Sequence, residues 1–221
     1  MITFKPHETL LHIKDHLSSA PIIIEAGAFE GKETIKMATF WPQSTIHAFE
    51  PVPELFAILQ KNTAQFPNII CYPLALSDTS GIATLYISEK PKKPGMPSQA
   101  NSLLKPKERL ALSPLTFPKT IQAPTITLDD WCAQYNVPRI DLLWLDLQGY
   151  ELNVLKASPK TLAHVKAICT EVEFVEAYEG QYQYSDVKSW LTAQGFEMIG
   201  KDFPDEPTWF FGNALFFRKS K

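Results

Sequence analysis

The chain alternates between short, continuously apolar runs and segments in which apolar residues recur at the spacing of a helix. The run at 21–25 is apolar almost throughout, as in a strand that is covered on both faces of a parallel sheet. A glycine-containing turn and a helical segment at 31–40 follow it. We expect strands at 21–25, 45–50, 69–72, 82–87, 140–146, 165–174, 195–199 and 209–217, and helices at 7–18, at 31–40, from Pro53, from Leu128, at 151–157 and from Ser185.

This order of elements predicts an α/β fold with a doubly wound, mostly parallel sheet of seven strands. No helix separates the last two strands, so the short loop between them requires antiparallel pairing and makes the last strand antiparallel. Thr127 and Ser185 are expected to cap the helices that begin beside them. We predict that residues 1–221 form a single domain.

One segment departs from this alternation. Residues 90–119 contain six of the 18 prolines of the chain, together with several lysines. Such composition is typical of an irregular, exposed insertion, and loops of this length are often functional or disordered. We therefore expect either a lid over the site or a disordered segment.

Composition restricts the classes of partner. The net charge is −3, with 21 basic and 24 acidic residues, so we expect neither a nucleic acid nor a membrane as partner. No signal peptide is readable, and no apolar stretch has the length of a membrane-spanning helix. The three cysteines are far apart and fit reduced thiols in a cytoplasmic protein.

In doubly wound sheets, ligands bind beyond the carboxyl ends of the strands. The first such turn reads Glu25-Ala-Gly27-Ala-Phe29-Glu30-Gly31. Phe29 stands where a dinucleotide fingerprint requires glycine, and Glu30 opposes a phosphate at the helix N-terminus, which argues against NAD and FAD. The turn suits a cationic ligand without phosphate, such as S-adenosylmethionine. A tight turn with two packing glycines is the alternative.

An acidic residue ends the next predicted strand. Glu50 follows Gly31 by 19 residues, the offset at which a carboxylate accepts hydrogen bonds from the hydroxyls of a ribose. The alternative is a charge at the N-terminus of the helix that starts near Pro53. The turn and Glu50 together indicate a nucleoside site better than either alone.

Four segments together resemble the FkbM family of S-adenosylmethionine-dependent methyltransferases: the first turn, Phe49-Glu50-Pro51, residues 75–78 and residues 140–151. The resemblance covers most of the chain, from about residue 22 to 217, except the insertion. It implies a class I methyltransferase fold, Rossmann-like, and mostly O-methylation of small molecules or glycans. It further implies that the cofactor is held by Glu25, Gly27, Gly31 and Glu50, with the backbone up to Ser77 beside the adenine.

Two positions differ from the pattern of that family. Glu25 stands where the family more often has aspartate, which is shorter by one methylene. Gln148 stands where the family usually has glutamate, so this position lacks a charge.

Carboxylates are the candidates for chemistry, because none of the five histidines is expected at the carboxyl end of a strand. Asp146 is the main candidate for the base, and for a place beside the cofactor, with a helix cap as the alternative. Glu171 and Glu173 share one face of their strand, and we expect Glu173 to take part in catalysis. With Asp146 they could also bind a divalent metal, although we do not favour one.

The sequence therefore predicts a methyltransferase that transfers a methyl group to a hydroxyl of a small metabolite or saccharide. Aromatic residues after the strand at 165–174 and around the last loop could hold such an acceptor, or could simply seal the edge of the domain. Two other functions stay open: a nucleoside-binding partner protein without catalysis, and a nicotinamide-dependent reductase. The aromatic residues are Tyr178, Tyr182, Tyr184, Phe203, Trp209 and Phe210.

Overall fold

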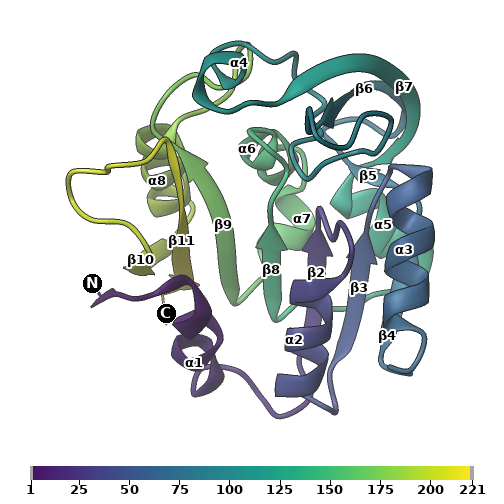
Figure 1. The fold of residues 1–221 in the computed structure, drawn as a ribbon. Coiled ribbons are helices and arrows are strands. Elements are labelled where there is room, and N and C mark those ends of the chain that lie inside the picture. The colour runs from purple at the N-terminus through teal and green to yellow at the C-terminus, as the bar shows by residue number, and fades with distance from the viewer. Residues whose placement is uncertain (1, 220–221) are drawn as a thin grey trace.

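The computed structural model describes residues 2–219, and its centre is an eight-stranded sheet in the order β1-β10-β11-β9-β8-β2-β3-β4 (Figure 1). Strands β9, β8, β2, β3 and β4 run parallel, and β11 is antiparallel to both of its neighbours. The predicted α/β architecture is thus confirmed, with the two-residue β1 added at one edge. The strands are β1 (Ile2–Thr3), β2 (Ile22–Ala26), β3 (Thr45–Phe49), β4 (Ile69–Tyr72), β8 (Leu142–Leu145), β9 (Ala167–Glu173), β10 (Phe196–Lys201) and β11 (Phe211–Arg218).

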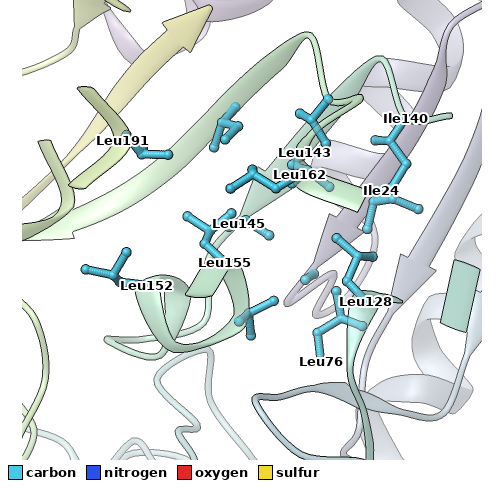
Figure 2. Packing of buried hydrophobic residues seen from close by; sticks show 14 of the residues in the cluster. Ile24, Leu76, Leu128, Ile140, Leu143, Leu145, Leu152, Leu155, Leu162 and Leu191 are labelled. Carbon is cyan, nitrogen blue, oxygen red and sulfur yellow. The ribbon is translucent and has the colours of Figure 1, made fainter. Parts of the chain in front are cut away.

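Helices cover both faces of this sheet. On one face, α1 and α2 bury Ile13 and Met37 against β2, β3, β8 and β9. On the other face, side chains from α5, α6, α7 and α8 pack against Ile24, Leu143 and Leu145 (Figure 2). The helices are η1 (Pro6–Glu8), α1 (Thr9–Lys14), α2 (Lys32–Phe40), α3 (Pro53–Thr63), α4 (Arg109–Leu112), α5 (Leu128–Tyr135), α6 (Glu151–Lys156), α7 (Pro159–Leu162) and α8 (Tyr184–Ala193).

Two helix starts differ in how well the sequence predicted them. The Thr127 side chain accepts a hydrogen bond from the backbone N–H of Asp130 at 3.0 Å, as expected of a cap. The last helix begins earlier than Ser185, because Gln183 is its N-cap and its backbone N–H donates to Asp186 at 2.9 Å.

At the other end of the chain, α1 covers only part of the expected 7–18, since the η1 turn precedes it and it ends at Lys14.

A second sheet lies beyond the carboxyl ends of the main strands (Figure 1). It consists of β5 (Ala75–Leu76), β7 (Thr116–Ile126) and β6 (Gly81–Glu89), in that order. The strand expected at 82–87 is therefore β6, and β7 has no counterpart in the sequence prediction. The prolines of β7 argued against a strand in the sequence. They are tolerated because β5 pairs only with the last two residues of β7, so that edge of β7 is otherwise free. Proline is tolerated on a free edge.

The insertion at 90–119 is more ordered than the sequence suggested. Its C-terminal part forms α4 and the first residues of β7, and its middle part is fixed by backbone hydrogen bonds to the segment after β9. Lys107 and Arg109 both donate to the carbonyl of Ala177, and Glu179 donates to that of Lys105. The insertion thus crosses over the carboxyl edge of the sheet instead of standing away from it.

The core provides a first prediction. Leu143 is fully buried in the cluster of Figure 2, and replacing it with alanine should lower the free energy of unfolding by about 2–5 kcal/mol. Leu11→Ala removes the same atoms from a side chain that is 58% exposed and should change stability by no more than about 0.5 kcal/mol. Urea denaturation of both variants compares them. Equal losses would contradict this account of the core.

Candidate active site

Two neighbouring cavities open at the carboxyl edge of the main sheet. The smaller one is lined by Glu50, by the backbone around β5, by Tyr150 and by residues 99 and 101–103 of the insertion. The larger one, about 950 Å³ in volume, extends over β8 and β9 toward α2 and the last loop. Four residues line both cavities: Gly27, Phe29, Gln99 and Asp146. The cavities therefore meet between the turn after β2 and the end of β8.

The turn after β2 is shaped by the close approach of β8. Gly27 has φ +86°, and a Cβ on it would lie 2.0 Å from the backbone oxygen of Asp146. Phe29 also has a positive φ, of 51°, which is uncommon for a bulky residue. Its backbone N–H donates to Glu50 Oε2 at 2.9 Å, so this conformation joins the turn to the end of β3.

Glu50 is held firmly at the wall of the smaller cavity. Oε1 accepts from the backbone N–H of Val52 at 2.9 Å, while Oε2 accepts from Phe29. Burial raises the pKa of Glu50 to about 7, and these two hydrogen bonds limit the rise. A carboxylate has about four lone pairs, so both oxygens keep capacity for further donors. This is the placement expected of an acceptor for ribose hydroxyls.

Glu25 lines the larger cavity and is 3% exposed. Its Oε2 has no hydrogen-bond partner among residues 2–219. Burial raises the pKa of Glu25 to about 8, and Thr34 limits the rise only in part. A buried carboxyl with one unpartnered oxygen beside a cavity fits a cationic ligand group, so the residues present fit the ammonium of S-adenosylmethionine.

Two of the predicted cofactor residues lie outside the linings of both cavities. Gly31 has φ +83° at the start of α2, and a Cβ on it would meet Leu59 at 2.7 Å, so its packing role is clear. Ser77 is buried, and its backbone N–H donates to the carbonyl of Ile126. The lining of the smaller cavity includes Ala75 and Leu76 but stops short of Ser77.

The end of β8 forms a network with β9. Gln148 Nε2 donates to Asp146 Oδ1 at 2.7 Å and to Glu171 Oε1 at 2.8 Å. The hydroxyl of Tyr178 lies 3.1 Å from Gln148 Oε1 and can donate to it. The position that departs from the family pattern is therefore the one that connects the candidate base to the neighbouring strand.

Glu171 and Glu173 both line the larger cavity, as their alternation on β9 predicted. Burial raises the pKa of both well above its usual value, and the charge of Asp146 adds to the effect. Arg109 of α4 acts in the opposite direction on both. Its guanidinium lies over the ring of Phe210 at 4.8 Å, and it is 7% exposed.

Arg109 is a site residue that the sequence analysis missed. It lies in the insertion, and its Nε has no hydrogen-bond partner in the described part of the chain. The available signal was slight: Arg109 is the single arginine of an insertion whose other basic residues are lysines. Its place in the site depends on backbone bonds between residues that are far apart in the sequence, which no local pattern reveals.

His47 is buried and lies outside the linings of both cavities. Burial lowers the pKa of His47 to about 4, so its ring stays neutral beside the hydroxyl of Tyr72 at 3.0 Å. Within residues 2–219, no group of three or more histidine, cysteine, aspartate or glutamate side chains is placed to hold a metal ion.

The aromatic residues divide into two sets. Tyr178, Trp209 and Phe210 line the larger cavity, and Trp209 is 58% exposed at its mouth. The other set packs into or against the main core instead, and comprises Tyr182, Tyr184 and Phe203.

Comparisons with known proteins agree with this geometry. Residues 25–198 match the Methyltransferase FkbM domain. The chain belongs to the FkbM methyltransferase family. It is 28% identical over 185 residues to 2-O-methyltransferase NoeI of Sinorhizobium fredii, covering 83% of this chain and 75% of NoeI. It is also 28% identical over 208 residues to Methyltransferase sdnD of Sordaria araneosa, covering 83% and 76% of the two chains.

Solved structures show the same fold at low identity. A magnesium protoporphyrin IX methyltransferase from Synechocystis with bound SAM superposes with a TM-score of 0.54 at 10% identity, over 96% of this chain and 80% of that one. An rRNA methylase from Streptococcus thermophilus gives 0.57 at 11% identity, over 100% and 99% of the chains. These structures show the class I fold, and the family match with the named relatives shows that the chain is an S-adenosylmethionine-dependent methyltransferase. None of the helices in residues 2–219 is long and apolar enough to cross a membrane.

The raised pKa of Glu25 provides a prediction on stability. Between its ordinary value of 4.5 and about 8, the folded protein keeps a proton that the unfolded chain releases. The contribution of this group to stability therefore falls as the pH rises through that range. Glu25→Gln should be more stable than the wild type at about pH 8, and the difference should shrink toward about pH 5.

Urea denaturation at several pH values measures this difference. Glu54→Gln, on an exposed side chain of α3, is the matched control and should follow the pH dependence of the wild type. A difference between Glu25→Gln and wild type that does not change with pH would show that Glu25 is ionised in the folded protein.

Proposed function

We propose that this methyltransferase methylates a hydroxyl group of a small metabolite or saccharide. The supporting observation is the position of Asp146, which lines both cavities and stands where they meet. A cofactor with its adenosine in the smaller cavity and its methionine end reaching past Gly27 toward Glu25 would meet an acceptor in the rest of the larger cavity at this carboxylate. Alignment of the two reacting groups supplies much of the catalysis in methyl transfer.

In this proposal Glu50 binds the ribose hydroxyls and Glu25 binds the ammonium group of the cofactor. The backbone at 75–76 lies along the adenine, and Gly27 leaves room beside Asp146. Gly31 and Ser77 support these elements from behind instead of contacting the ligand. The cofactor supplies a methyl group on a positively charged sulfur, and its transfer to a hydroxyl releases a proton.

Asp146 is the proposed acceptor of that proton. A positioned base of this kind contributes about 10²–10⁴-fold to a rate. Glu173 and Glu171 then bind other hydroxyls of the acceptor, and Arg109 faces them from α4 at more than ion-pair distance. Hydroxyl groups both donate and accept, so a polyol can lie between carboxylates and a guanidinium without leaving either unpaired.

The larger cavity supports a saccharide in particular. Its volume of about 950 Å³ is large enough for more than one sugar ring, and Trp209 presents an exposed aromatic face at the mouth. The similarity to a 2-O-methyltransferase points the same way. The non-catalytic alternative is not favoured by the family match or the named relatives, and no observation favours a reductase.

We further propose that the acceptor is not a nucleic acid and that the protein is cytoplasmic. The net charge of −3 supports the first point, and the rRNA methylase resembles this chain in fold alone. The three cysteines are free, which supports a reducing compartment. A resident divalent metal stays outside the proposal.

The role of Glu50 can be tested by calorimetry with S-adenosylhomocysteine. Glu50→Ala should weaken binding by roughly 1–3 kcal/mol, because ribose hydroxyls would lose their buried acceptor. Glu54→Ala removes an exposed carboxylate four residues away and should bind as the wild type does. Unchanged affinity in Glu50→Ala would remove Glu50 from the cofactor site.

The role of Asp146 needs an activity measurement. Transfer of labelled methyl groups to a panel of methyl glycosides and oligosaccharides should be detectable with the wild type. Asp146→Asn should lower kcat by about 10²–10⁴-fold, since the amide cannot take up a proton. Circular dichroism and urea denaturation of the same variant serve as the folding control. Full activity in Asp146→Asn would assign the base elsewhere.

A further inference from the structure

One amide group holds two of the site carboxylates. Gln148 Nε2 carries two N–H bonds, and it lies 2.7 Å from Asp146 Oδ1 and 2.8 Å from Glu171 Oε1. Each carboxylate therefore receives one donor from the same nitrogen. The two acids come from different elements, the loop after β8 and the strand β9, so Gln148 fixes their separation.

The orientation of this amide is determined by its surroundings. The hydroxyl of Tyr178, a side chain that is 1% exposed, lies 3.1 Å from both Gln148 Oε1 and the carbonyl oxygen of Ala100, and its one proton can be donated to either. Turning the amide over would direct its carbonyl oxygen at Asp146 Oδ1 and Glu171 Oε1 and would remove both hydrogen bonds that Nε2 donates. The orientation with Nε2 toward the acids is thus strongly preferred.

The backbone of Gln148 is fixed as well. Its φ of +52° is in the left-handed region, which is costly for a residue with a side chain. Its carbonyl oxygen accepts from Ser102 Oγ of the insertion at 2.8 Å. The following Gly149 lies against Gln181, where a Cβ would approach to 3.2 Å. Strain at this one residue is therefore balanced by contacts on both sides.

The groups that face Asp146 are mostly acidic. Burial raises the pKa of Asp146, and the hydrogen bond from Gln148 and the charge of Arg109 both act against that rise. A carboxyl group at position 148 would remove the hydrogen bond that the Gln148 amide donates to Asp146, and it would add a further negative charge. The titratable and charged groups that interact with Asp146 are Glu25 on β2, Glu50 after β3, Glu151 on α6, Cys169, Glu171 and Glu173 on β9, and Arg109 on α4.

We propose that Gln148 is a positioning residue for the proton transfer, because its amide, bonded to both Asp146 and Glu171, holds the Asp146 carboxyl at the junction of the two cavities. This inference rests on the proposed O-methylation. The O–H bond of the acceptor breaks, and its proton goes to an oxygen of Asp146. An electron pair of the acceptor oxygen forms the new bond to the methyl carbon, and the electron pair of the broken carbon–sulfur bond stays on sulfur. Glu171 is the second anchor of the amide and does not take the proton.

The test is the titration of Asp146 itself, followed by NMR in protein labelled with ¹³C at the aspartate side-chain carboxyl. The spectrum of Asp146→Asn identifies the resonance. In Gln148→Glu, two acids share this position, so the resonance should complete its titration about one pH unit or more above its wild-type value. Tyr178→Phe releases the amide and should shift the titration in the same direction by less.

Gln181→Glu is the matched control. Gln181 is as buried as Gln148, at 7% exposed, but it bonds to the backbone of Tyr178 and Val175 and to neither carboxylate. Its variant should move the Asp146 resonance clearly less than Gln148→Glu does. An equal shift in Gln181→Glu would mean that any added charge has this effect, and would overturn the proposal.

The pH profile of methyl transfer adds an independent measurement. The apparent pKa of the acidic limb of kcat/KM should rise together with the NMR titration. At a fixed pH on that limb, each pH unit of rise lowers the rate about tenfold. An Asp146 resonance that titrates alike in wild type, Gln148→Glu and Tyr178→Phe would overturn the role of Gln148, even where hydroxyls are methylated. A shifted resonance without methylation of any hydroxyl acceptor would overturn the proposed function alone.

Discussion

The site depends on the close contact between the ends of β2 and β8. At Gly27 the backbone passes so near the carbonyl of Asp146 that no side chain fits between them. This contact brings the turn after β2 against Asp146 at the place where the two cavities meet. The hydrogen bond from Phe29 to Glu50 extends the same arrangement to β3. A larger residue at position 27 would separate all three strand ends at once.

The insertion contributes the parts of the site that the main sheet lacks. The parallel strands place acidic residues at one edge, but they provide neither the arginine nor the segment that covers the cavities. Arg109, Ser102 and Gln99 come from the insertion. Arg109 reaches the site because its segment is bonded to the residues after β9, and Ser102 and Gln99 reach it because theirs is bonded to β6. The proline-rich composition therefore describes a segment that is irregular in its backbone but specific in its contacts.

The sequence predicted the parts of the site that follow from strand order. Glu25, Glu50 and Asp146 each end a strand, and parallel strands place such residues along one edge, so their convergence could be foreseen. The strand β7 could not, because its prolines are tolerated only on account of the short β5 beside it. The bond of Gln148 to Glu171, and the placing of Arg109, depend on pairings between distant segments that leave no local periodicity.

The buried carboxyls also change the electrical charge of the whole molecule. The formal charge of −3 at pH 7 assumes that every acidic side chain is ionised, and the isoelectric point of about 6.0 assumes that each has its ordinary pKa. In the folded protein the pKa of Glu25 and of Glu151 is about 8, and those of Glu171 and Glu173 are raised well above normal, all chiefly by burial. The native molecule thus carries fewer negative charges than its sequence suggests, and electrophoresis should find it uncharged at a pH above 6.0. Unfolding would return those charges, so the two states migrate differently in a field near neutral pH.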